Sequence, residues 1–69
     1  MKQYEVHHVE RGGFPGACFA WFEAPTDKAA KSPSCWEPHF NRSVNTGHCG
    51  IRIFRAADRK CIFRKFRGA

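Results

Sequence analysis

The stretch Cys49–Arg67 reads CGIRIFRAADRKCIFRKFR, and it decides how the C-terminal part of the chain folds. Two runs rich in β-branched and aromatic residues flank a polar corner at 57–60, which is the pattern of a β-hairpin. Ile51 and Ile53 alternate with Arg52, so one side of the first run is apolar and the other is charged. We therefore expect two antiparallel strands in this stretch.

The same stretch carries the charge of the protein. Of the twelve basic residues, seven lie from position 51 onward against a single acid, Asp58, whereas residues 1–50 sum to zero; the formal net charge of +6 is that of the hairpin. The seven are Arg52, Arg55, Arg59, Lys60, Arg64, Lys65 and Arg67. A basic surface of this kind favours a polyanion or an acidic protein as its partner. We expect these seven residues to bind that partner.

Aromatic rings are interleaved with the basic residues. The rings are Phe54, Phe63 and Phe66. Guanidinium groups pair with phosphates and rings stack on unpaired bases, so the pattern suits nucleic acid. The alternative, which we favour for these rings, is that they form the core beneath a solvated cationic face. The alternation is imperfect, because Arg55 falls on the side of Ile51 and Lys65 on the side of Phe63.

The N-terminal half predicts two more strands. Residues 3–10 alternate with Tyr4 and Val6 on one face, and the alternation slips at His7-His8, where we expect a bulge. Residues 17–24 are apolar on both faces.

The two faces of residues 17–24 differ in the size of their side chains. Cys18 and Phe22 fall on one face, and Phe19 and Trp21 on the other. A domain of this size covers one face well, so we expect Phe19 and Trp21 to be available to a partner.

The middle of the chain predicts a short helix and a loop. Thr26 can cap a helix that begins at Asp27, and Ser32-Pro33 can begin a second turn, which we expect Pro38 to end. Residues 38–48 lack periodicity and predict an ordered loop anchored by Trp36 and Phe40. The order is therefore ββαββ, in a single domain over residues 1–69. The predicted fold class is α+β, a small antiparallel sheet with one short helix packed on it.

Length and composition narrow the function classes. The 69-residue chain has no apolar run of membrane-spanning length and no secretory signal peptide, so we expect a cytoplasmic protein without a membrane partner. Its four cysteines are then expected to be reduced thiols, buried as small hydrophobes.

Metal binding and catalysis are the weaker hypotheses. Cys35, His39, His48 and Cys49 together could form a Cys2His2 zinc site, but their spacing fits zinc fingers poorly and Pro38 interrupts it. Histidines could cleave RNA by acid–base chemistry, yet nothing fixes two of them across one site. We therefore expect no metal, no cofactor and no catalytic residue, and the protein is expected not to be an enzyme.

The pattern as a whole resembles the small phage-encoded anti-CRISPR proteins that inhibit type I surveillance complexes. The resemblance rests on four segments: Tyr4–Gly12, Trp21–Ala24, Asp27–Ala30 and the hairpin Gly50–Arg64. The net charge of +6 departs from the acidic members of that group and excludes imitation of DNA. The resemblance implies a non-catalytic inhibitor that occupies a surface of a host nucleoprotein complex, with no functional residue carried over.

Two functions from different classes follow. The first is a phage-type inhibitor that acts in the host cytoplasm and docks on a host protein or nucleoprotein complex, a CRISPR effector by the resemblance, through the basic hairpin. The second is a module that binds RNA or DNA directly. Binding to bare nucleic acid with a steep salt dependence separates them, because only phosphate neutralisation gives that slope with any sequence.

Overall fold

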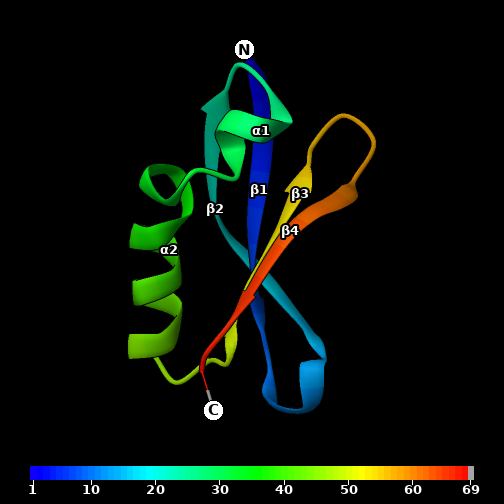
Figure 1. Ribbon diagram of the computed structural model, residues 1–69. Helices are drawn as coiled ribbons and strands as arrows, with labels where there is room; N and C mark the ends of the chain where they lie inside the picture. The colour runs from blue at the N-terminus through cyan, green and yellow to red at the C-terminus, as the bar shows by residue number, and fades with distance from the viewer. Residues whose placement is uncertain (69) are drawn as a thin grey trace.

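The computed structural model describes residues 1–68 and shows four strands that form one antiparallel sheet, in the order β2-β1-β3-β4. Along the chain the elements are β1 (Lys2–Val9), the 3-10 turn η1 (Arg11–Gly13), β2 (Pro15–Ala24), α1 (Asp27–Ala30), α2 (Pro33–Asn45), β3 (Gly50–Arg55) and β4 (Lys60–Phe66). Both helices lie on the same side of the twisted sheet (Figure 1). The α+β class, the ββαββ order and the C-terminal hairpin are confirmed.

The core lies between the sheet and the helices. Tyr4 and Val6 of β1 and Ile51 and Ile53 of β3 are fully buried there, because β1 and β3 are the two central strands. Ala24 and Ala30 complete the buried cluster, and partly buried rings of α2 and of strands β2 and β4 pack around it. Arg52 points away from this core, as the alternation predicted.

The helix α2 corrects the expected loop over residues 38–48. The predicted N-terminus at Ser32-Pro33 is confirmed, but the helix continues through Pro38 to Asn45. Proline removes one intrahelical hydrogen bond, here the one to the carbonyl of Ser34, whose residue is exposed to water. Trp36 and Phe40 recur at helical spacing and pack on the core, so their burial offsets that loss. None of the helices in the described chain has the length and apolar character of a membrane span.

The bulge expected at His7-His8 of β1 is wrong: the pairing of β1 with β2 has two register shifts, and in both the extra residue lies in β2. Pairing runs from Val6↔Ala20 to His7↔Cys18, so Phe19 is the extra residue, whereas β1 pairs with β3 without interruption. Val9 consequently stays off the helix-covered side; it is buried but is not part of the main core cluster. The bulge therefore brings Phe19 to the helix-covered side of β2 and Cys18 to the other side.

Candidate functional site

The side of the sheet opposite the helices forms a surface that we call the open face. Its side chains, assigned from strand alternation and register, are Gln3, Glu5, His7 and Val9 of β1, Cys18, Trp21 and Glu23 of β2, Arg52 and Phe54 of β3, and Cys61, Arg64 and Phe66 of β4. No helix of residues 1–68 covers this face, and Figure 1 shows both helices on the other side. The open face is where a partner can contact the sheet.

Two arginines oppose each other at one edge of the open face. Arg52 of β3 is the register partner of Arg64 of β4, and neither forms an ion pair with a carboxylate within the described residues. Arg52 donates one hydrogen bond to the carbonyl of Gly13 in η1, at 3.0 Å. Like charges placed directly opposite in a sheet destabilise it. An anion bound between the two guanidinium groups would remove that repulsion.

Exposed rings accompany these arginines. Trp21 is 60% exposed and Phe66 is 47% exposed, whereas Phe54 is partly buried with its ring against His7 at a centroid distance of 4.7 Å. Phe63 instead packs on the core beside Trp36, as the core hypothesis predicted for it. Of the three hairpin rings, only Phe63 therefore belongs to the core.

Phe19 is a correction to the predicted partner-binding residues. Because Phe19 is the extra residue of the bulge, it turns to the helix side, where its ring stacks on His8 with centroids 3.9 Å apart and packs on the core. Cys18 takes the vacated position on the open face, next to His7. Trp21 remains on the open face, so the predicted pair is divided between the two sides of the sheet.

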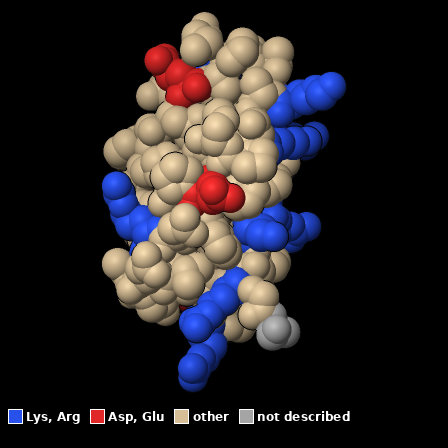
Figure 2. Space-filling model, turned by 60° about the vertical axis from the view of Figure 1, so that its left-hand side comes forward, with Lys and Arg blue, Asp and Glu red and all other residues tan. Residues whose placement is uncertain are grey.

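The other basic residues of the hairpin are dispersed. Lys65 lies on the helix side, with its ammonium 5.9 Å from the ring centroid of Trp36. Arg59 and Lys60 lie at the β3–β4 turn, and Arg67 follows the end of β4. On the side of the molecule drawn in Figure 2, Lys and Arg side chains project from both edges and from the lower end, whereas acidic side chains show mainly at the upper end and near the centre. The structure therefore places the basic charge around the hairpin and not on one surface.

Arg55 is engaged inside the fold. Its guanidinium pairs with Asp27 of α1 and donates to both carboxylate oxygens of Asp58, at 2.9 and 2.7 Å. The buried hydroxyl of Tyr4 donates to the other oxygen of Asp27 at 2.7 Å. This network fastens α1 to the hairpin, so Arg55 has a structural role that the sequence did not reveal.

The network shifts the pKa values of its members. The hydrogen bond from Arg55 lowers the pKa of Asp58 to about 2, and the hydrogen bond from Tyr4 lowers the pKa of Asp27. Burial, together with the hydrogen bond to Asp27, raises the pKa of Tyr4 to about 12. All three shifts favour an ionised carboxylate and a neutral phenol at neutral pH.

We expect this network to stabilise the fold in a pH-dependent way. Both carboxyls have pKa values below the unfolded value of about 3.9. Their stabilisation is present above that value and is lost as the pH falls through their folded-state pKa values. The melting temperature of Arg55→Gln should therefore lie below that of the unmodified protein at about pH 6, and the gap should close toward about pH 2. Arg42→Gln is the control, since Arg42 is exposed and forms no ion pair within residues 1–68. If the difference in melting temperature between Arg55→Gln and the unmodified protein did not change with pH, the assignment of this network as the pH-dependent element would be wrong.

The residues of the predicted Cys2His2 set are used separately. Cys35 donates its thiol to the carbonyl of Ala29, and His39 lies between Phe19 and Phe22. His48 pairs with Glu10 and stacks on His8. Within the described chain, no cluster of potential metal ligands includes any of the four predicted residues.

The histidines do not form an acid–base pair across an open site. His8 and His48 stack with centroids 3.7 Å apart, and His8 is hydrogen-bonded to the buried hydroxyl of Ser43 at 2.7 Å. Burial lowers the pKa of His8, with a further contribution from His48. Burial likewise lowers the pKa of His39, whose Nδ1 lacks a hydrogen-bond partner within residues 1–68. These rings serve packing between the sheet and α2.

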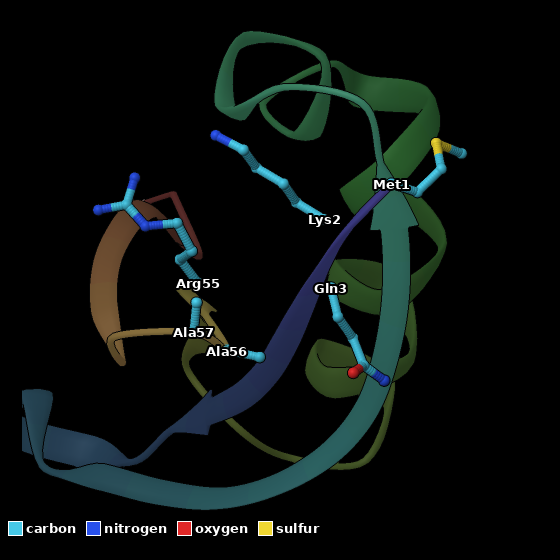
Figure 3. A pocket seen from close by; sticks show the side chains of 6 residues that line it. All are labelled: Met1, Lys2, Gln3, Arg55, Ala56 and Ala57. Carbon is cyan, nitrogen blue, oxygen red and sulfur yellow. The ribbon is translucent and has the colours of Figure 1, made fainter.

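A hollow of about 650 Å³ lies at the other end of the sheet from η1. It is lined by Met1, Lys2, Gln3, Arg55, Ala56 and Ala57. Figure 3 shows Lys2 and Arg55 extending on the same side of the hollow, with the two alanines beneath Arg55. Because Asp27 and Asp58 already neutralise Arg55, the hollow offers a ligand little beyond Lys2, and we assign no site to it.

Comparison with known proteins adds no relative: no family model, no curated protein and no solved structure matches the chain.

Proposed function

We propose that this protein is a non-catalytic binding protein that holds a single strand of nucleic acid on the open face of its sheet. The observation that carries the proposal is the cross-strand pair Arg52–Arg64, which lacks a carboxylate partner within the described residues and shares its face with Trp21 and Phe66. The predicted basic hairpin remains at the centre of this proposal, with Arg59, Lys60 and Arg67 at its margins.

The chemistry suits phosphate and base together. A guanidinium group donates paired hydrogen bonds to phosphate oxygens, and an exposed ring accepts a base on its face. Neighbouring strands lie about 4.8 Å apart, so the four strands from Trp21 to Arg64 span about 14 Å. One extended strand of nucleic acid that crosses this width can stack a base on the ring near β2 and place a phosphate beside the arginine on β4.

The shape favours a single strand over a duplex. Reading a duplex groove requires a helix or a two-stranded ribbon that projects into it. Here α2 packs on the opposite side of the sheet, and β3 is paired with β1 as well as with β4, so the β3–β4 pair is not a free ribbon. Stacking on Trp21 requires a base that is free of its neighbours, which a duplex does not provide.

Fluorescence anisotropy with labelled oligonucleotides tests the proposal. Single-stranded RNA and DNA of mixed sequence should bind, and duplexes of equal length should bind more weakly. For two or three contacted phosphates, the plot of log binding constant against log salt concentration should have a slope between about −1.4 and −2.1. Absence of binding to any single strand at low salt would refute the proposal.

The second candidate is the phage-type inhibitor suggested by the anti-CRISPR resemblance. It is favoured by Phe14, which is 69% exposed in the turn between β1 and β2, on a different element from the paired arginines. Aromatic side chains are enriched in the centres of protein–protein interfaces. In this case the protein should ignore bare nucleic acid, inhibit a type I CRISPR effector complex in the host cytoplasm, and lose that inhibition in Phe14→Ala.

A further inference from the structure

Three potential metal ligands meet on the open face. The side chains of Glu5, His7 and Cys18 place one ligand atom each within 4.8 Å of the others. The Nε2 atom of His7 lies 3.0 Å from Oε1 of Glu5. Over residues 1–68 this is the one group of three or more such side chains that come this close.

The fold brings these three side chains together. Glu5 and His7 are two residues apart on β1 and so project from the same face. Regular pairing after Val6↔Ala20 would place Phe19 opposite His7, but the bulge places Cys18 there. Bulges often redirect a side chain next to a functional site. Here the bulge also packs Phe19 against the core on the other side of the sheet.

We propose that Glu5, His7 and Cys18 bind a divalent transition metal, Zn²⁺ in the first instance. Zinc accepts thiolate, imidazole and carboxylate ligands, and bond lengths of about 2.0–2.3 Å place tetrahedral ligand atoms about 3.3–3.7 Å apart. Side-chain torsions that move the ligand atoms by about an ångström therefore complete the site from the observed arrangement.

The surroundings suit a metal site with one position open to solvent. The side chains of His7 and Glu5 are 25% and 17% exposed, and the ring of Phe54 closes one side of His7. The carboxylate and the thiolate would balance the two charges of the cation. Arg52, the register partner of His7, extends to the carbonyl of Gly13 in η1. Three protein ligands leave a fourth position for water or an exogenous ligand.

Cobalt is the probe for this site, because a cobalt–thiolate bond gives a charge-transfer band in the near ultraviolet. Co²⁺ added to the reduced protein should produce that band together with the visible bands of tetrahedral cobalt, and Zn²⁺ should remove both by displacement. Cys18→Ser should abolish the charge-transfer band, and Glu5→Gln should weaken Co²⁺ binding by about tenfold or more.

The double variant Cys35→Ser/Cys49→Ser is the matched control, because it removes the thiols of the site suggested by sequence and spares Cys18. It should retain the band. The inference would be overturned by a band that survives Cys18→Ser, by a band lost in the control, or by no band in excess Co²⁺. Metal binding alone is measured, so the result is independent of whether the open face binds nucleic acid.

Discussion

Replacing Gly50 by alanine should leave little of the protein folded. Gly50 begins β3, between Val9 of β1 and Phe66 of β4, and is buried with φ at +156°. A Cβ atom added there would lie 2.2 Å from the carbonyl oxygen of Lys65 and 2.9 Å from Cα of Phe66. These are backbone atoms, so only separation of β3 from β4 can relieve the clash.

The expected cost is large relative to the stability available. Backbone strain at such a φ costs about 1–3 kcal/mol, and parting the strands removes several hydrogen bonds of about 1 kcal/mol each. The sum exceeds about 4 kcal/mol, whereas a chain of this length has about 3–10 kcal/mol in total. Urea titration followed by circular dichroism measures the loss.

Gly47→Ala is the control for Gly50→Ala. Gly47 also has positive φ, +93°, but nothing lies within 4 Å of the position that an added Cβ atom would take, so only backbone strain is introduced. Its destabilisation should be about 1 kcal/mol. Equal stabilities for the two variants would show that the β3–β4 contact at Gly50 is looser than the structure has it.

Local patterns in the sequence sufficed for the strands and for the hairpin. Ile51 and Ile53 alternate with Arg52, and this alternation survives because β3 is central and its buried face tolerates no slip of register. The alternation also placed Arg55 on the side of Ile51 and Lys65 on the side of Phe63, although both residues were expected to bind a partner. Their contacts on that side were not predicted, because Asp27 and Trp36 belong to helices distant in the sequence.

Tertiary contacts decided the features that the sequence analysis missed. Pro38 is a strong local signal for a helix end, but the packing of Trp36 and Phe40 on the sheet outweighs it. The bulge at Phe19 is likewise invisible in the pattern of β2, because either face of that strand is apolar. The bulge lies where Phe19 can stack on His8 on the helix side and Cys18 can lie beside His7 on the open face.

The candidate site was predictable only in part for the same reason. Charge segregation pointed to Arg52 and Arg64, and the aromatic strand pointed to Trp21. The cluster of Glu5, His7 and Cys18 depends on the register of β1 against β2. The spacing of the cysteines along the sequence does not reveal that register. The sole available signal was the pair Glu5 and His7, two residues apart on a predicted strand.

The double variant Arg52→Gln/Arg64→Gln should lose nucleic-acid binding while it keeps the fold. Arg64 is exposed and forms no ion pair within residues 1–68, and Arg52 gives up one hydrogen bond to Gly13, which is typically worth about 1 kcal/mol. Relief of their mutual repulsion offsets part of that loss. Charge-assisted contacts to phosphate contribute about 1.5–3 kcal/mol each, so affinity should fall by about a hundredfold or more.

The matched control is Lys28→Gln/Lys31→Gln, which removes the same charge from exposed positions in and beside α1, away from the open face. Its affinity should fall by less than about threefold at physiological salt, because charges farther than about 8 Å from the strand are screened. The salt slope of the arginine variant should become shallower by about 1.4, and that of the lysine variant should be unchanged. If both variants weaken binding equally, net charge alone attracts the nucleic acid, and the open face is not its binding site.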